Sequence, residues 1–170
     1  MSYRITGTGS CIPDIAKKNS DFLKNKFLDT DGGKFKSSNS EIIDKFNSIT
    51  GIYERRYASD EINCSDLAAV AADLAINDSK LDQETLDYII VAHNTGDISC
   101  SSGQVDTLPS VASKVKAKLK IKNPNCVAYD IICGCPGWVE GIIQAKSFIK
   151  SGMAEKCLVI GCDTLSRILD

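Results

Sequence analysis

Residues 126–165 read CVAYDIICGCPGWVEGIIQAKSFIKSGMAEKCLVIGCDTL, and this stretch decides the fold class. It opens with an apolar run, which predicts a buried strand, and then turns sharply into a helix that ends near Gly152. A second apolar run over residues 156–165 predicts another buried strand. Strands that alternate with helices of about 10 to 15 residues indicate a layered α/β fold.

The chain before this stretch shows the same alternation. Residues 3–13 predict a first strand that breaks into a loop at its glycines and proline, and residues 86–94 predict a buried strand. Between them, residues 65–78 predict an alanine-rich helix with Ser65 as its N-cap. The predicted apolar face of that helix consists of Leu67, Val70, Ala71, Leu74 and Ala75.

A polar segment interrupts this pattern near the N-terminus. Residues 17–39 are polar and contain an Asp-Gly-Gly turn signal, so we expect a surface insertion. A helix capped by Ser38 or Ser40 follows, and residues 53–57 predict a short strand. We expect residues 1–170 to form one domain.

Composition excludes several functional classes. The net charge is -2 and 43% of the residues are hydrophobic, so the sequence predicts a globular chain with no nucleic-acid partner. No apolar run approaches the roughly 18 residues of a membrane span, and the first residues do not resemble a secretory signal. We therefore expect a cytoplasmic protein with no membrane partner.

One local charge pattern leaves two interpretations open. Lysines at every second position lie on a helix that continues into a loop, and they predict either a solvated surface or a docking surface for an acidic carrier protein. These residues are Lys114, Lys116, Lys118, Lys120 and Lys122.

The eight cysteines do not form a metal-binding pattern. Their close spacings are C-x-C and C-x4-C, and the chain has one histidine, whereas zinc sites need C-x2-C pairs or several histidines. We expect no metal and no other cofactor. In a reducing compartment most of these cysteines are expected to be buried free thiols.

Cys135 differs from the other cysteines in its setting. Pro136 suits the first position of a helix, which puts Cys135 at or next to the N-cap. Unpaired N–H groups and the positive end of the helix dipole stabilise a thiolate there. Cys135 is therefore the candidate nucleophile, whereas Cys133 ends the strand on another side of the turn and is predicted to be a core residue.

Several stretches together resemble one family, β-ketoacyl-acyl carrier protein synthase III. AYDIICGCPGW resembles its active-site elbow, in which an aspartate precedes an apolar run, the nucleophilic cysteine, a small residue, a glycine and an aromatic residue. The other similar stretches are ITGTGSCIP, TGIYERRYA, SDLAAVAADLAI and SGMAEKCLVIGCDTLSRILD.

The resemblance implies a thiolase-like α/β fold. In that fold one βαβαβαββ half contains a five-stranded mixed sheet flanked by helices, two halves make a subunit, and two subunits make a homodimer. The chain corresponds to the N-terminal half. The family's histidine and asparagine belong to the C-terminal half, so this fragment alone is expected to be inactive in condensation.

The implied reaction has two stages. Cys135 takes an acyl group from an acyl thioester, either acyl-coenzyme A or acyl-acyl carrier protein. A decarboxylative Claisen condensation with malonyl-acyl carrier protein follows, as in fatty acid or related lipid and natural-product synthesis. Hydroxymethylglutaryl-coenzyme A synthase and thiolase share the fold and the nucleophile, and a non-catalytic half-domain would keep the elbow for packing alone.

Three positions bear on the substrate. Leu108 aligns with an aromatic position that in the family reaches from one subunit into the partner's acyl pocket, and a leucine there would admit a bulkier chain. Ile49 and Lys45 align with the arginine and tryptophan that hold the nucleotide end of coenzyme A. Because neither replacement keeps bidentate or stacking contacts, we expect a carrier protein as the acyl donor. His93 is interpreted as a polar residue at a strand end.

Overall fold

The computed structural model describes residues 3–168, which form two compact units. Unit 2 is the continuous segment Pro13–Tyr57, and unit 1 is built from the residues before and after it. We expected one domain with an insertion at 17–39, and those residues lie within unit 2. None of the helices in residues 3–168 is long and apolar enough to cross a membrane.

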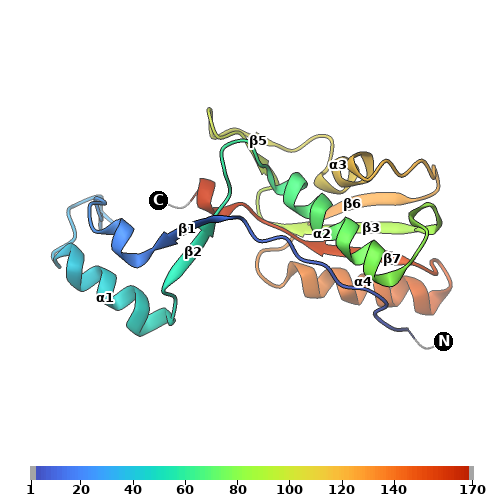
Figure 1. Ribbon diagram of the computed structural model, residues 1–170, viewed down its shortest axis with the longest axis horizontal. Coiled ribbons are helices and arrows are strands. Elements are labelled where there is room, and N and C mark those ends of the chain that lie inside the picture. The colour runs from blue at the N-terminus through green and yellow to red at the C-terminus, as the bar shows by residue number, and fades with distance from the viewer. Residues whose placement is uncertain (1–2, 169–170) are drawn as a thin grey trace. The chain divides into compact units, whose positions relative to one another are not determined.

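Unit 1 is built around a parallel sheet of three strands (Figure 1). The central strand β3 (Tyr88–His93) pairs with β6 (Val127–Ile132) on one side and with β7 (Cys157–Gly161) on the other. Residues 89–93 of β3 are buried. The buried apolar run therefore occupies the middle of the sheet, as expected for a strand covered on both faces.

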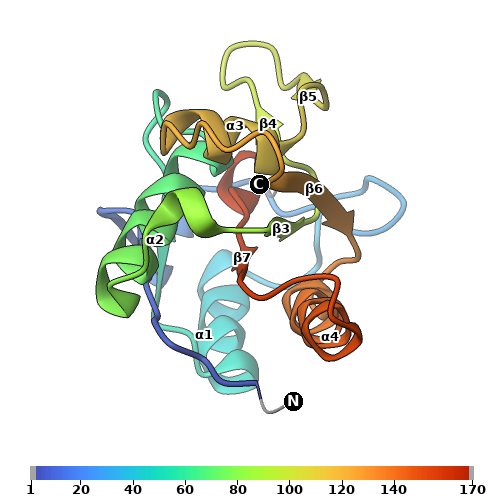
Figure 2. The ribbon, with the colours of Figure 1, turned by 90° about the vertical axis from the view of Figure 1, so that its right-hand side faces the viewer.

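Helices cover both faces of this sheet (Figure 2). The helices α2 (Cys64–Ser79) and α3 (Val111–Lys118) lie on one face, and α4 (Gly137–Ser151) lies on the other. Two short strands, β4 (Asp97–Ile98) and β5 (Val105–Asp106), pair antiparallel in the connection between β3 and α3. The chain thus has the α/β layering that its alternating pattern predicts.

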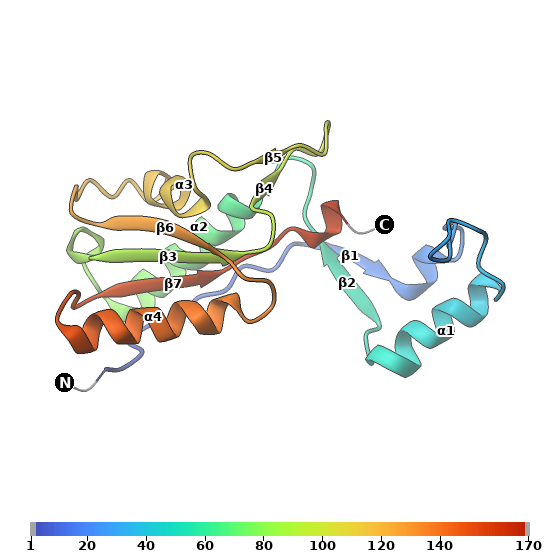
Figure 3. The ribbon, with the colours of Figure 1, turned by 180° about the vertical axis from the view of Figure 1, so that it is seen from behind.

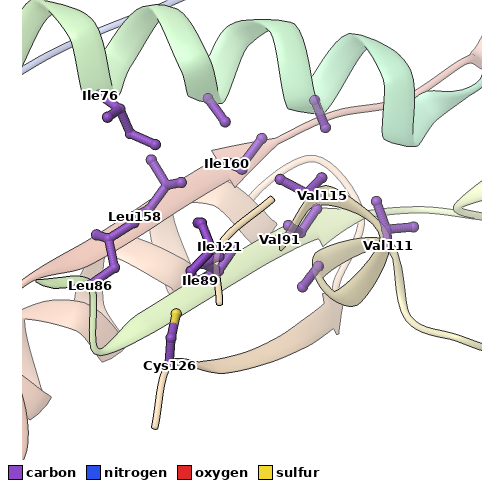
Figure 4. Packing of buried hydrophobic residues seen from close by; sticks show 13 residues of the cluster. Ile76, Leu86, Ile89, Val91, Val111, Val115, Ile121, Cys126, Leu158 and Ile160 are labelled. Atoms are coloured by element: carbon purple, nitrogen blue, oxygen red, sulfur yellow. The ribbon is translucent and has the colours of Figure 1, made fainter. Parts of the chain in front are cut away.

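The hydrophobic core lies between the sheet and the α2–α3 layer (Figure 4). Alternate residues of the strands point into it, as the two-residue period of a strand requires. The core residues include Ile89 and Val91 from β3, Leu158 and Ile160 from β7, Ile76 from α2, and Val111 and Val115 from α3.

Unit 2 contains an antiparallel pair of strands, a 3-10 helix (Asn19–Phe22) and an α-helix (Figure 3). Strand β1 (Ile15–Lys18) pairs antiparallel with β2 (Glu54–Tyr57), and α1 (Asn39–Thr50) lies between them in sequence. Ser38 caps α1, because its hydroxyl accepts a hydrogen bond from the Glu41 N–H at 3.3 Å. This confirms one of the two predicted caps.

The prediction of a five-stranded mixed sheet is wrong. The sheets of the described chain have three, two and two strands, and residues 3–14 contain no strand. The segment predicted as the first strand lies along α2: a Cβ on Gly9 would come within 2.2 Å of the Ala71 carbonyl oxygen. The N–H of Thr8 donates to the carboxylate of Asp78. The glycines let this backbone pack against a helix instead of pairing in a sheet.

Helix α2 also differs from its prediction. Its N-cap is Asn63, and Ser65 instead donates its N–H and hydroxyl to Asp97 at 2.7 and 2.9 Å. Val70 and Leu74, both assigned to the buried face, are about half exposed. Apolar residues occur on every side of this alanine-rich helix, so periodicity alone does not select the buried side. That side consists of Cys64, Ser65, Leu67, Ala68, Ala72 and Ile76.

The close packing of α4 on the sheet depends on Gly141. A Cβ at this position would lie 2.8 Å from Cγ1 of Val159. We expect Gly141→Ala to lower the free energy of unfolding by about 1–3 kcal/mol through overpacking, although alanine favours a helix by about 1 kcal/mol. Urea denaturation measures the change.

The matched control is Ser147→Ala on the exposed side of the same helix. It raises helix propensity without a new contact, so its stability should rise by a few tenths of a kcal/mol. A stabilised Gly141→Ala variant would show that α4 is not held against β7 at this distance.

Candidate active site

The candidate site is the turn that joins β6 to α4. The strand ends at Ile132, and Gly134 adopts a left-handed conformation with φ of 63°. The Gly137 N–H donates to the Gly134 carbonyl at 3.0 Å, which closes the turn. A residue with a Cβ is strained at such a φ, so glycine permits the sharp reversal.

Cys135 lies at the outside of this turn. It directly precedes Pro136, the N-cap of α4, and it is exposed. No side chain caps the start of α4 in the described chain. The sulfur therefore has access to solvent beside a helix N-terminus, where N–H groups and the dipole favour negative charge.

Small residues hold the start of α4 close to the sheet. A Cβ on Gly137 would lie 3.1 Å from Cβ of Ala92 on β3. A Cβ on Gly161, at the end of β7, would lie 3.1 Å from Cβ of Trp138. The three strands thus end under the first turn of α4, which fixes the position of the elbow.

Asp130 anchors the strand that leads into the elbow. Its carboxylate accepts hydrogen bonds from the N–H groups of Val111 and Ala112 at 2.7 and 2.8 Å, at the start of α3. Nε2 of His93 lies 3.0 Å from the same carboxylate. Burial acts to raise the pKa of Asp130, but these three hydrogen bonds outweigh it and the pKa is lowered.

His93 has a structural role at the end of β3. It is the last residue of β3, it is 5% exposed, and it bonds to Asp130. An ionised carboxylate only accepts hydrogen bonds, so Asp130 holds the tautomer with hydrogen on Nε2. The imidazole therefore supports the strand end and does not face solvent.

Two residues beside the elbow, Asn94 and Asp163, were not predicted from the sequence. Asn94 follows β3 and donates its N–H and its side-chain amide to Asp163, which follows β7, at 2.9 and 2.6 Å. The Asn94 side-chain oxygen lies 3.6 Å from where a Cβ on Gly134 would be. The available signal was their position, since sites in parallel sheets gather at the carboxyl ends of the strands.

The other predicted site residues are divided between the two units. Leu108 is in unit 1, between β5 and α3, and is 81% exposed. Lys45 and Ile49 are on α1 in unit 2, where Ile49 is 77% exposed. Two surface hollows of about 370 and 700 Å³ also lie in unit 2, and neither includes Lys45 or Ile49.

The expectation that Cys133 is a core residue is wrong. Its side chain is exposed, like that of Cys135. It comes directly after β6, which is an edge strand of the sheet, so no further strand among residues 3–168 covers that side. The two thiols therefore differ in their distance from the helix start and not in their access to solvent.

The lysines of the α3 region are largely engaged within the chain. Lys114 bonds to Asp97 and Asp106 at 3.0 and 2.8 Å, and Lys118 bonds to Asp66 at 2.6 Å. Lys116 donates to two backbone carbonyls. These contacts neutralise or fix three of the five ammonium groups.

No group of three or more metal-binding side chains occurs among the residues that the structure describes. The elbow itself offers a thiol, backbone N–H groups and small neighbouring residues. This arrangement suits a nucleophile that a substrate must approach closely.

Comparison with known proteins shows what this elbow and the rest of the chain are similar to. Residues 129–170 match the family described as 3-oxoacyl-[acyl-carrier-protein (ACP)] synthase III. β-Ketoacyl-[acyl-carrier-protein] synthase III 1 of Vibrio parahaemolyticus is 37% identical over 170 residues. The synthase III of Neisseria gonorrhoeae is 38% identical over 171 residues. The chain is a homologue of one half of β-ketoacyl-[acyl-carrier-protein] synthase III.

The chain matches only part of each relative. The whole chain aligns with the two synthase III relatives, but it spans only 46% and 47% of their lengths. The crystal structure of synthase III from Aquifex aeolicus superposes on 98% of the chain, with a TM-score of 0.75 and 34% identity, and 46% of that structure is covered. The expected thiolase-like α/β architecture is thereby confirmed, apart from the number of strands in the sheet.

Proposed function

We propose that this chain is the nucleophile-bearing, N-terminal half of a synthase III-like condensing enzyme in fatty acid or related lipid synthesis. The supporting observation is the exposed thiol of Cys135 directly before the N-cap of α4. We propose acyl carrier protein as the partner, because the names of the relatives include it. In the whole enzyme we expect the family's homodimer.

In the first step Cys135 attacks the carbonyl carbon of an acyl thioester. The C–S bond to Cys135 forms, the C–S bond to the carrier breaks, and the carrier leaves as a thiolate that takes up a proton. The backbone N–H of Cys135 is the candidate donor to the thioester oxygen as it gains charge. Loss of such a donor costs about 3 kcal/mol of transition-state stabilisation.

In the second step malonyl-acyl carrier protein loses carbon dioxide, and the resulting carbanion attacks the acyl group on Cys135. The Cys135 thiolate is the leaving group, so the nucleophile is regenerated. His93 is bonded to Asp130 and buried. We therefore assign activation of the extender to the other half of the enzyme.

Preferential labelling of Cys135 tests the role of the helix start. After brief treatment with iodoacetamide at neutral pH, we expect peptide mass spectrometry to find Cys135 alkylated about tenfold faster than Cys133. Both thiols are exposed, so accessibility alone does not separate them. Equal rates at the two cysteines would remove the evidence for an activated nucleophile.

The acyl donor is a separate proposal. Ile49 and Lys45 offer neither a guanidinium nor a large aromatic ring at the positions assigned to nucleotide binding. We expect the full-length enzyme to use an acyl-acyl carrier protein at least about tenfold more efficiently than acetyl-coenzyme A, measured as kcat/KM. Equal efficiency would refute the proposed donor without affecting the role of Cys135.

Leu108 is proposed to line the acyl pocket. Its exposed side chain carries less volume than an aromatic ring, so longer or branched acyl groups should be accepted. Comparing Leu108→Phe with the unchanged enzyme across a series of acyl lengths measures this effect.

A further inference from the structure

Two cysteines outside the candidate site face each other inside unit 1. The sulfur atoms of Cys64 and Cys162 lie 2.9 Å apart, although the residues are 98 positions apart in sequence. Both are free thiols, Cys64 fully buried and Cys162 partly buried. The proposed function uses neither of them.

The backbone holds each cysteine in place. The Cys162 N–H donates to the Ala92 carbonyl at 3.0 Å, beside the end of β7. Cys64 is the first residue of α2, and the next residue, Ser65, is bonded to Asp97 through its N–H and its hydroxyl. The two sulfurs therefore face each other from anchored segments.

The separation is suited to bond formation. A disulfide has an S–S distance of about 2.05 Å, so closing the gap needs a movement of less than about 1 Å. Small changes in the two side-chain torsions can supply that movement. We therefore expect disulfide formation to require no rearrangement of the sheet or of α2.

We propose that Cys64 and Cys162 are a site of oxidative modification, at which hydrogen peroxide converts the two thiols into a disulfide. Cys162, the more accessible thiol, attacks the peroxide O–O bond and becomes a sulfenic acid, and one water leaves. Cys64 attacks that sulfur, forms the S–S bond and releases a second water. Two thiols are oxidised and one hydrogen peroxide is reduced to two waters.

The environment separates this pair from the candidate nucleophile. The contact with Cys64 and then burial raise the pKa of the Cys162 thiol, and neighbouring acidic groups, among them Asp163 and Asp130, add to the effect. Because the thiolate is the species that attacks a peroxide as well as a thioester, oxidation of Cys162 should be slow at neutral pH and faster as the pH rises. The short sulfur–sulfur distance is the feature that favours a disulfide once Cys162 has been oxidised.

The disulfide would join two parts of unit 1 that bear on the elbow. Cys162 directly precedes Asp163, which holds Asn94 beside Gly134. Cys64 lies at the start of α2. Oxidation would thus link the residue before Asp163 covalently to the first residue of α2, whether or not Cys135 carries an acyl group.

The test uses the full chain with Cys133 and Cys135 replaced by serine, which removes two exposed competing thiols. After treatment with hydrogen peroxide, non-reducing digestion and mass spectrometry should recover a peptide pair joined through Cys64 and Cys162, about 2 Da lighter than the sum of the reduced peptides. Closing a loop of this length should raise the melting temperature by about 10 °C, and dithiothreitol should reverse the rise.

Three further variants make the result specific. Cys64→Ser should abolish both the joined peptide and the rise in melting temperature, and Cys162→Ser should do the same. Cys126→Ser removes another buried free thiol and should leave the joined peptide unchanged. Absence of the Cys64–Cys162 peptide, or a disulfide that joins other cysteines instead, would overturn the proposal.

Discussion

Replacing Cys135 with alanine is expected to abolish acyl transfer to the protein. No other atom at the elbow replaces the sulfur that forms the thioester bond, so acyl-enzyme formation should fall by about 10³-fold or more. Incubation of the full-length enzyme with a short-chain acyl thioester, followed by intact mass measurement, detects the added acyl group. The loss should occur without unfolding, because Cys135 is exposed.

The matched control is Cys133→Ala. Cys133 is equally accessible but lies two residues further from the helix start, so acyl transfer should be retained. If Cys133→Ala loses the acyl adduct while Cys135→Ala keeps it, the nucleophile has been assigned to the wrong thiol.

Asp130→Ala is expected to produce the largest loss of stability in unit 1. The change leaves the N–H groups of Val111 and Ala112 and the imidazole of His93 without their shared acceptor. Groups left unsatisfied in a partly buried site cost about 3 kcal/mol in the free energy of unfolding. Urea denaturation measures this loss.

Asp73→Ala is the control for this change. Asp73 is exposed and accepts one hydrogen bond from Asn77, so its removal should change stability by less than about 0.5 kcal/mol. Equal losses in the two variants would mean that Asp130 does not anchor β6 to α3.

The lowered pKa of Asp130 also predicts a pH dependence. A carboxyl whose pKa is lower in the folded state stabilises the protein above its unfolded pKa of about 3.9 and loses that contribution as pH falls through the folded pKa. The stability of the unchanged protein should therefore drop more steeply below pH 4 than that of Asp130→Asn. Parallel curves for the two proteins would contradict the assignment.

The sequence predicts the elbow because its signals are local. Apolar residues before Cys133, a glycine and a proline at the turn, and Gly152 after the helix each act through nearby backbone geometry. The structure has a strand, a helix start and a helix end at the corresponding positions. For the same reason Ser38 could be recognised as a cap.

The parts that the sequence does not predict depend on contacts between distant segments. Residues 3–13 alternate like a strand, but Gly7 and Gly9 also allow the backbone to lie against α2, and composition does not distinguish the two outcomes. Asp130 and Asn94 likewise gain their roles from partners that are 18 or more positions away. No periodicity in the chain reports such pairings.

The division of the chain has a consequence for its synthesis on the ribosome. Unit 2 is continuous, so all of its contacts are available once Tyr57 has emerged, whereas β3 must wait for β6 and then for β7, which starts at Cys157. The residues before Pro13 similarly wait for α2. Vectorial synthesis should therefore complete unit 2 first and leave the residues before Pro13 without their partner until α2 has emerged.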